Sequence, residues 1–472
     1  MRMPTAAEVR ASIVNGDVTA REVVAATLDR IHAVDDQLHS FVTIADEHAM
    51  GQVDDLERRA AAGEKPGALW GVPFSVKDLY DTADVRTTYG SRAFHRHVPD
   101  RDAELVARVR RAGGILVGKT NTPEFAIYIR TVNDLQPETV NPWDPRRTSG
   151  GSSGGAASSA AAGLTPIAIG SDGGGSVRIP SALCGLVGLM PSRGSIPRGG
   201  GRIGTRRFSS AGPMALDAGD ALTLLRVMKG PSAQDALSRG LSPTGVPAHP
   251  ISASTPRLRW IEESGVDGCE QDVVATVRQA ADSFAEQMGA RLDVPGVSLE
   301  SPRFAQAFYT MMQADRLSTG GRELLADPVA SALLTGYARH HFEQAAHIDG
   351  AAYSAALEMQ LVATDHLLRL LDGVDVVLTP TLGFIAPEIP EGTQSLPEDA
   401  RRGFVAFTFL MNYTGFPAAT VPCGLVRGMP VGMQLIGRPG TEETLLALCH
   451  RFQWSVYRLP QIPDFATTPM SQ

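Results

Sequence analysis

The order in which apolar and amphipathic segments follow one another constrains the fold of this 472-residue chain more than any other feature. Short apolar segments of the kind that form buried strands occur at 71–78, 115–119, 166–170, 374–380 and 432–437. Helical periodicity lies between and around them, at 102–112, 219–229, 272–288, 353–372 and 441–454. Strands that alternate with helices predict an α/β fold with a largely parallel or mixed central sheet. The length allows one large domain with insertions or two to three domains.

Two helix starts are signalled near the N-terminus. Thr5 with Glu8, and Thr19 with Glu22, each give the Ser/Thr-x-x-Glu pattern of a capping box before an apolar-periodic run. Both segments are therefore predicted to be helices.

Composition and charge narrow the class of protein. Hydrophobic residues make up 43% of the chain and charged residues 20%, which is enough apolar material for a sizeable core. The net charge of −8 disfavours a nucleic-acid partner, because a phosphate-binding face needs concentrated Lys and Arg. The most apolar run, 404–411, soon meets Asn412 and Gly415, too early to span a bilayer. The first residues lack the hydrophobic block of a signal peptide. We therefore expect a cytoplasmic protein with no membrane partner.

The four cysteines are scattered and show no metal-ligand spacing. In a reducing compartment such residues are more often small buried hydrophobes than ligands. The sequence thus predicts no structural metal and no cofactor.

Residues 149–163 read SGGSSGGAASSAAAG, which by composition is a flexible linker. The segment, however, lies between NPWDPRRT and PIAIG, and its Ala-rich half can form a helix. A fifteen-residue linker between core elements is unusual in a compact domain. The one stretch with linker character is 230–256, which is rich in Pro, Ser and Gly. Because strands and helices alternate on both sides of it, a surface connection is the alternative to a domain boundary.

Three motif matches fail on their context. GGILVGKT (113–120) matches a phosphate loop, but its residues 115–117 are themselves the expected strand. GGGRIG (199–204) matches a dinucleotide-binding loop, but no strand precedes it. GGSSG (150–154) matches a nucleophile elbow, but residues 141–145 before it, NPWDP, do not read as a buried strand.

The second glycine-rich stretch, GSDGGGSVRIPS (170–181), has the composition of an acyl-transfer site. Consecutive glycines let backbone N–H groups converge on one point, where they stabilise an anion such as the oxyanion of an acyl-transfer intermediate. Ser176 ends the glycine run and is therefore a candidate nucleophile. No histidine is obviously placed as its base, but Lys77 ends an apolar strand. Burial disfavours the charged form of a lysine, so Lys77 can serve as base, with a second serine as proton relay.

These residues resemble the amidase signature family. The resemblance rests on GVPFSVKDL (71–79), GKTNTPEF (118–125), the block from NPWDP to SGGSSGG (141–155), GSDGGGSVRIPS (170–181) and PVGMQLIGRP (430–439), and it runs in order from about residue 5 to about 455. It implies a single domain over 1–472, with a catalytic core at about 60–215, a substrate-shaping region at about 216–425 and C-terminal core elements at 426–460. The implied fold is a large mixed central β-sheet flanked by helices on both faces.

The resemblance also implies a Ser–cis-Ser–Lys triad. Ser176 corresponds to the nucleophile, Lys77 to the buried base, and Ser152 to the bridging serine, preceded by a cis peptide bond. The backbone N–H groups of Gly173, Gly174, Gly175 and Ser176 correspond to the oxyanion hole.

Two positions depart from the usual family pattern without touching the triad. Gly174 stands where many members carry a side chain, and Met190 stands where a lysine is common. Arg178 is expected to anchor the nucleophile loop rather than to bind substrate. Segment 126–134 is less typical of the family, and we expect part of it to line the acyl pocket, with core or loop packing as the alternative. The substrate-binding candidates are Tyr128, Ile129, Arg130, Thr131 and Val132.

The resemblance thus implies an enzyme that cleaves the carbon–nitrogen bond of a small amide through an acyl-enzyme, as a monomer or homodimer. Carbamates, aryl amides and esters are further substrate classes, because each presents a carbonyl to the same nucleophile. The alternative is the amidase subunit of a tRNA-dependent amidotransferase. Those subunits usually read R-Q-P after the nucleophile, whereas this chain has Arg178-Ile179-Pro180, which disfavours the alternative.

Overall fold

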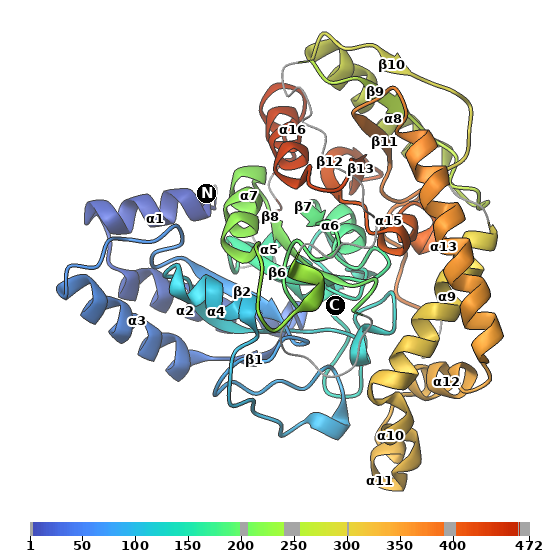
Figure 1. The fold of residues 1–472 in the computed structure, drawn as a ribbon. Coiled ribbons are helices and arrows are strands. Elements are labelled where there is room, and N and C mark those ends of the chain that lie inside the picture. Colours follow the sequence, from blue (N-terminus) through green and yellow to red (C-terminus); the bar gives the residue numbers. More distant parts are fainter. Residues whose placement is uncertain are drawn as a thin grey trace.

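A mixed β-sheet runs through the whole structure (Figure 1). The computed structural model describes residues 3–198, 206–239, 255–299, 302–390, 403–460 and 462. Within these residues, eleven strands lie in the order β1-β3-β2-β6-β8-β7-β12-β13-β11-β9-β10. The strands are β1 (Phe41–Ile44), β2 (Pro73–Lys77), β3 (Ile115–Thr120), β6 (Ile167–Asp172), β7 (Val187–Met190), β8 (Ser210–Ala215), β9 (Leu258–Trp260), β10 (Leu292–Asp293), β11 (Val376–Pro380), β12 (Ala418–Val426) and β13 (Met429–Ile436).

Helices cover both faces of this sheet, as the sequence predicts. The helices are α1 (Ala6–Asn15), α2 (Ala20–Leu38), α3 (Asp46–Ala61), α4 (Glu104–Arg111), α5 (Gly154–Ala161), α6 (Arg178–Cys184), α7 (Ala218–Met228), α8 (Gln271–Gln287), α9 (Pro302–Arg316), α10 (Arg322–Ala326), α11 (Pro328–Ala332), α12 (Gly336–Ala345), α13 (Gly350–Leu370), α15 (Phe409–Thr414) and α16 (Glu442–Ser455). Strand β3 shows how the two layers arise from side-chain alternation. Ile115 and Val117 pack in one core cluster with α2 and α3, whereas Leu116 belongs to the cluster of α4 and α7.

The parallel arrangement of β2 and β6 positions the site. Both strands run in the same direction, with Phe74 opposite Ile167 and Val76 opposite Ile169. Lys77 is the last residue of β2 and Asp172 the last of β6. Because parallel strands end at the same edge of a sheet, the two chemically distinctive segments of the sequence meet there.

Most expected elements are confirmed. Both capping boxes are present at the starts of α1 and α2. All five expected strands and all five expected helices form, with small shifts at their ends. The Ala-rich half of 149–163 is α5, and every residue of that helix is buried. Its alanines pack on Ala168 of β6 and Met214 of β8, so the small side chains allow a close approach to the sheet.

Some expectations need correction or fall outside the described residues. Part of the segment before GGSSG does form a strand: β5 (Asp144–Thr148) pairs with β4 (Val140–Asn141) in a separate two-stranded sheet. Most residues of β5 are at least partly exposed, so it is still not the buried strand of a nucleophile elbow. Most of the linker-like stretch and all of GGGRIG lie outside the described residues.

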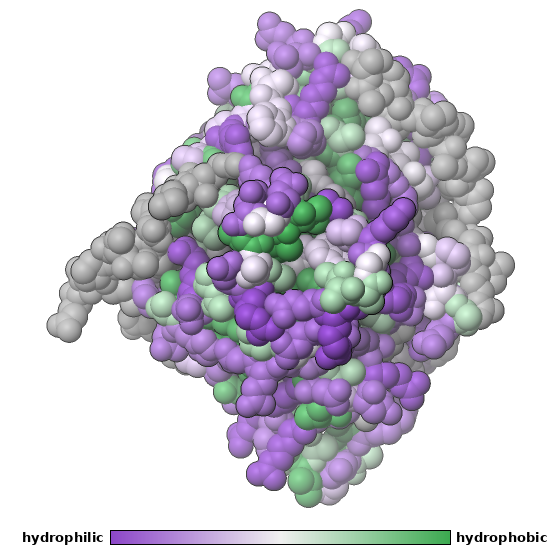
Figure 2. Space-filling view, turned by 90° about the vertical axis from the view of Figure 1, so that its left-hand side faces the viewer, coloured by the Kyte–Doolittle hydropathy of each residue, from purple (hydrophilic) through white to green (hydrophobic). Residues whose placement is uncertain are grey.

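Helices α9 to α13 form a separate layer beside the main sheet, at the right of Figure 1. Within it, α9 packs against α13 and α15. On the opposite side of the molecule, the face around α1 to α3 is mainly hydrophilic, with an apolar patch near its middle (Figure 2). No helix within the described residues is both long and apolar enough to cross a bilayer.

Candidate active site

The amine of Lys77 lies among three serine hydroxyls. Lys77 is fully buried, and its Nζ is 2.6 Å from Ser152 Oγ, 2.9 Å from Ser171 Oγ and 3.0 Å from Ser153 Oγ. The cluster joins the end of β2, the end of β6 and the turn before α5. The sequence prediction that Lys77 is buried beside the paired serines is confirmed.

Burial lowers the pKa of Lys77 well below its usual value. The nearby carboxylate of Asp172 raises that pKa, whereas the positive charges of Arg316 and Arg198 lower it further. Desolvation is the largest of these effects, because moving an ammonium group out of water disfavours its charged form. The environment therefore favours the neutral amine, which is the form that can accept a proton.

The hydrogen bonds around Ser153 determine how the neutral amine is oriented. Ser153 Oγ accepts the N–H of Ser171 at 3.1 Å and donates its own proton to the carbonyl of Ser171 at 3.1 Å. Its contact with Lys77 must therefore be an N–H that the amine donates. A second N–H can point to the Ser171 hydroxyl. The lone pair of a neutral Lys77 is then left to face Ser152, the shortest of the three contacts.

The turn that carries Ser152 is held by close backbone packing. The peptide bond Gly151–Ser152 is cis, as the family resemblance predicts. A Cβ on Gly151 would lie 2.7 Å from the carbonyl carbon of Ile129, so only glycine fits against that backbone. Thr131 Oγ1 donates to the carbonyl of Gly150 at 2.9 Å and accepts the N–H of Gly154 at 3.0 Å. The glycine-rich segment is thus a packed turn and not a linker.

Ser176 ends the second glycine-rich turn and is partly exposed. Its carbonyl accepts the N–H of Ser153 at 3.2 Å, which ties the two turns together. In the described residues no hydrogen bond joins Ser152 Oγ to Ser176 Oγ. Catalytic hydrogen bonds are often long before substrate binds, so this geometry is compatible with a relay that forms in the complex.

The expected oxyanion hole needs one correction. The N–H of Gly175 donates to Asp172 Oδ1 at 2.7 Å and is therefore already engaged. Within the described residues, the N–H groups of Gly173, Gly174 and Ser176 have no protein acceptor. These three remain the candidate donors for an oxyanion, because an N–H already bound to a carboxylate gives little to a second anion.

A buried ionic network supports this turn, and of its members sequence reasoning assigned only Arg178. Asp172 accepts the N–H groups of Gly175, Val177 and Arg178, and pairs with the Arg178 guanidinium at 3.0 Å. Asn412 of α15 donates to Asp172 Oδ1 at 2.9 Å and accepts from Arg178 at 2.6 Å. Although burial alone would raise it, the pKa of Asp172 is lowered by Arg178, Asn412 and the backbone N–H of Gly175. The expectation that Arg178 anchors the loop is confirmed.

Of the five substrate-binding candidates, Ile129, Arg130 and Thr131 lie against the Ser152 turn, and most of the five are bound to protein. Tyr128 is buried and stacks on Tyr337 with ring centroids 4.9 Å apart. Arg130 is 2% exposed and pairs with Glu138, and the carbonyl of Val132 accepts the Tyr337 hydroxyl at 2.9 Å. Ile129 is half-buried against Gly151. For Arg130 and Thr131, these contacts favour the packing role over direct substrate binding.

Lys119, the lysine of the phosphate-loop match, has a structural environment. It is fully buried, and its Nζ donates to the carbonyl of Tyr80 at 2.7 Å and to Thr87 Oγ1 at 2.6 Å. Asp78 Oδ1 lies 3.5 Å away. A buried lysine with these partners is not available to a phosphate, so the rejection of that motif holds.

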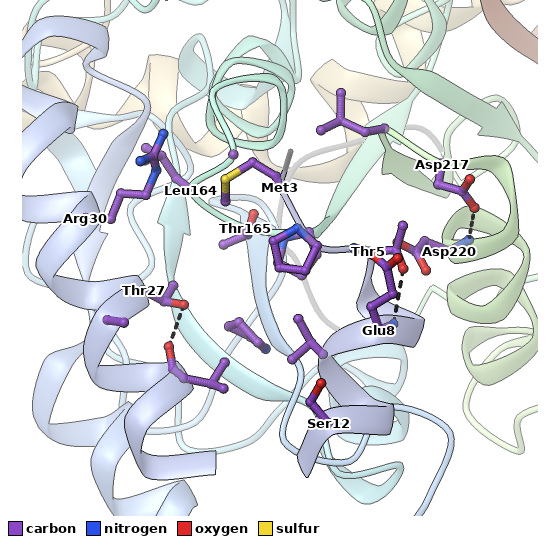
Figure 3. A pocket seen from close by; sticks show the side chains of 18 of the residues that line it. Met3, Thr5, Glu8, Ser12, Thr27, Arg30, Leu164, Thr165, Asp217 and Asp220 are labelled. Carbon is purple, nitrogen blue, oxygen red and sulfur yellow. Dashed lines mark hydrogen bonds between the residues drawn. The ribbon is translucent and has the colours of Figure 1, made fainter. Parts of the chain in front are cut away.

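A cavity of about 420 Å³ lies at the opposite end of the same strands. Pro73, at the start of β2, and Pro166, just before β6, line it together with residues of α1 and α2. Figure 3 shows Arg30 and Leu164 on one side of this cavity and Asp217 and Asp220 on the other. Lys77, Ser152 and Ser176 do not line it, so the cavity is separate from the candidate active site.

Comparison with known proteins identifies the family. The sequence profile of the family described as Amidase matches residues 22–446. The chain belongs to the amidase signature family. The match covers the segments of Lys77, Ser152 and Ser176.

Individual relatives of this amidase signature chain have two kinds of name. A curated relative from Roseiflexus sp. (strain RS-1), named as a Glutamyl-tRNA(Gln) amidotransferase subunit, is 33% identical over 491 residues, covering 97% of this chain and 98% of the relative. The structure of a bacterial aryl acylamidase superposes with a TM-score of 0.88 at 25% identity, covering 99% of each chain. The structure of the Glutamyl-tRNA(Gln) amidotransferase subunit from Thermotoga maritima gives a TM-score of 0.75 at 26% identity, covering 94% of each chain.

Proposed function

We propose that this chain hydrolyses the carbon–nitrogen bond of a small amide through an acyl-enzyme on Ser176. The observation that carries the proposal is the 2.6 Å contact between the buried amine of Lys77 and the hydroxyl of Ser152. A lysine whose burial favours the neutral form is a base, and a serine hydroxyl beside it can relay a proton. Membership of the amidase signature family supports the same chemistry.

The reaction begins with two proton transfers. Neutral Lys77 takes the proton of Ser152, Ser152 takes the proton of Ser176, and Ser176 Oγ attacks the substrate carbonyl carbon. The carbonyl oxygen becomes an oxyanion that the N–H groups of Gly173, Gly174 and Ser176 stabilise. When the carbon–nitrogen bond breaks, Ser152 gives its proton to the leaving amine and regains one from Lys77. Water then enters, loses a proton along the same relay, and releases the acid.

The names of the curated relatives favour a second candidate function. Those relatives, 30 to 33% identical, are named as subunits of an amidotransferase, which makes this chain a candidate amidase subunit that supplies ammonia from a primary amide such as glutamine. This structure superposes with a higher TM-score on the aryl acylamidase than on the Thermotoga maritima protein, which favours a hydrolase that acts alone. Ile179 after Arg178 also departs from the usual pattern of those subunits. The proposal therefore keeps the stand-alone hydrolase as its main form, with carbamates and esters as further substrates.

A substrate panel with the isolated chain tests the proposal. Glutamine, other primary amides, anilides, carbamates and esters are compared by kcat/KM, and intact mass after a serine-reactive phosphonate locates the nucleophile. Turnover of anilides by the single chain supports the stand-alone hydrolase. Turnover of glutamine and of no other substrate in the panel supports the function as amidase subunit of an amidotransferase. Ser176→Ala is expected to abolish every activity, and an active Ser176→Ala variant would refute the assignment.

The proposal includes the setting in which the chain works. The substrate is a small molecule, and the chain acts without nucleic acid, membrane, metal or cofactor, as a cytoplasmic monomer or homodimer. The net charge of −8 supports the absence of a nucleic-acid partner. Size-exclusion chromatography with light scattering measures the oligomeric state, and a larger assembly of the isolated chain would contradict this part.

A further inference from the structure

Helix α9 brings a cation close to the catalytic groups. Phe308 of this helix faces the nucleophile loop, since a Cβ on Gly174 would lie 3.4 Å from Phe308 Cζ. Met312 and Arg316 follow at intervals of four residues, so the three side chains share one broad face of the helix. Arg316 Nη2 donates to the carbonyl of Ala126 at 3.0 Å, at the start of the segment expected to line the acyl pocket.

Arg316 is a buried cation without an anion among the described residues. Arg316 is only 8% exposed, and its buried Nε has no hydrogen-bond acceptor. In the described part of the chain, Arg193 is held by backbone carbonyls alone. Two other buried guanidinium groups near the site are paired with carboxylates, Arg178 with Asp172 and Arg130 with Glu138. Buried charges are normally compensated in this way, because an unpaired charge in a low-dielectric interior is costly. The charge of Arg316 therefore calls for an anionic partner, which the described residues do not supply.

The surroundings of Arg316 place that partner beside the reacting groups. Its charge is close enough to Lys77 to lower the pKa of that amine. Phe125 and Ala126 both have positive φ, 51° and 55°, a conformation that non-glycine residues adopt only when the surrounding structure enforces it. The Ala126 carbonyl takes one Nη2 donor of Arg316, and a guanidinium has five N–H donors, so donors without an acceptor among the described residues remain.

We propose that Arg316 binds a carboxylate on the acyl portion of the substrate. A guanidinium presents its donors as a fork that matches a carboxylate, and the hydrogen bonds are strengthened by charge on both sides. The substrate class is then a dicarboxylic acid monoamide or a related amide whose acyl chain ends in a carboxylate. The inference rests on the proposed function, because it places the scissile carbonyl at Ser176 and the carboxylate at Arg316.

A binding measurement tests Arg316 independently of turnover. In the Ser176→Ala background, calorimetry compares the monoamides of succinic, glutaric and adipic acid with the matching neutral diamides. For at least one chain length we expect the monoamide to bind at least about tenfold more tightly, as charged hydrogen bonds typically give. Adding Arg316→Met is expected to reduce this ratio to near one, and adding Arg316→Lys to keep part of it.

Arg193 provides the matched control. It is also a buried guanidinium whose pKa burial lowers to about 10, but its Nη2 donates to the carbonyls of Asn412 and Tyr413 at the end of α15. Arg193→Met in the same background is expected to leave the monoamide-to-diamide ratio unchanged. Equal affinity for acid and diamide at every chain length, or a ratio that Arg316→Met does not change, would overturn the inference.

A turnover measurement separates this inference from the proposed function. Anilides of the three monoacids and of uncharged acids of equal length are compared by kcat/KM in the wild type and in Arg316→Met. A selective loss of about tenfold or more on the charged anilides supports the inference, and an equal loss on both series refutes it. If the wild type cleaves neither series while calorimetry still shows the Arg316-dependent preference, the proposed function fails and the carboxylate subsite stands.

Discussion

Lys77 and Ser152 lie 75 residues apart in the chain, yet the amine of one is 2.6 Å from the hydroxyl of the other in a fully buried site. The two residues meet because β2 ends with Lys77 at the edge of the sheet where the turn of Ser152 leads into α5. Both partners are excluded from water, so the contact persists only if the amine is neutral or if its charge is compensated. The pair thus combines a structural requirement with the chemical role proposed for it.

Removing the relay hydroxyl is the most direct check of this contact. Ser152→Ala is expected to lower kcat/KM for an anilide by about 10²–10⁴-fold, the usual contribution of a positioned acid–base group. Ser158→Ala is the matched control, because Ser158 is a buried serine of α5 whose hydroxyl donates only to the carbonyl of Val140. That variant should stay within a few-fold of wild type. Equal losses in the two variants would show that Ser152 acts through packing alone.

The pH dependence of activity follows from the form of Lys77 that is needed. The amine must be neutral to accept a proton, and burial lowers its pKa well below the usual 10.5. We therefore expect kcat/KM to rise with pH through the depressed pKa and to level off below pH 10.5. A profile from pH 6 to 10 measured under conditions where chemistry is rate-limiting tests this. A flat profile over that range would contradict the assignment of Lys77 as the base.

The same pKa makes the stability of the fold depend on pH. Between the depressed folded pKa and 10.5, Lys77 is protonated in the unfolded chain and neutral in the folded one, so folding releases a proton and stability rises with pH. Lys77→Met lacks this term. As pH rises toward 10.5, the free energy of unfolding of the wild type should therefore increase relative to that of Lys77→Met, by at most about 1.4 kcal/mol per pH unit. Denaturant unfolding of both proteins across this range gives the slope, and parallel pH profiles would refute the neutral folded form.

The sequence predicts the three candidate catalytic residues better than it predicts the contacts that hold them in place. Ser176 ends a glycine run and Lys77 ends an apolar strand, so local pattern indicates both, whereas Ser152 is assigned through the family resemblance. Asn412 lies 240 residues from Asp172, inside an apolar segment that gives no sign of a polar contact. The sequence places the N–H of Gly175 in the expected oxyanion hole, because it cannot show that a neighbouring carboxylate already binds this N–H. Contacts of this kind depend on how distant helices pack, so they become visible only in three dimensions.

The Asp172–Arg178 pair should contribute strongly to stability because both side chains are fully buried. Arg178→Met leaves the Asp172 carboxylate buried without its cation, which is expected to cost about 3–5 kcal/mol of unfolding free energy. Arg146→Met removes an ion pair with Asp144 in which the arginine side chain is 80% exposed, and its effect on stability should be much smaller, because exposed ion pairs contribute little. Denaturant unfolding followed by circular dichroism compares the two. A loss below about 1 kcal/mol in Arg178→Met would show that the network is not needed to hold the loop.

Two glycines of the nucleophile loop differ sharply in what they tolerate. Gly175 has a φ of 127°, and a Cβ there would lie 2.2 Å from Thr408 Oγ1, so Gly175→Ala combines backbone strain with overpacking, each worth about 1–3 kcal/mol. At Gly173 the nearest atom to an added Cβ is Ser209 Cβ, at 3.6 Å, which is an ordinary contact.

Gly175→Ala is accordingly expected to lower the unfolding temperature and to reduce kcat by more than tenfold, because the loop that carries Ser176 must move to accept the new methyl group. Gly173→Ala keeps its backbone N–H and is expected to retain stability and most of its activity. Thermal unfolding and single-turnover acylation of the two variants give the comparison. Since alanine leaves both N–H donors in place, a loss confined to Gly175→Ala assigns the effect to loop geometry, whereas a comparable loss in Gly173→Ala would mean that substrate occupies the space beside Gly173.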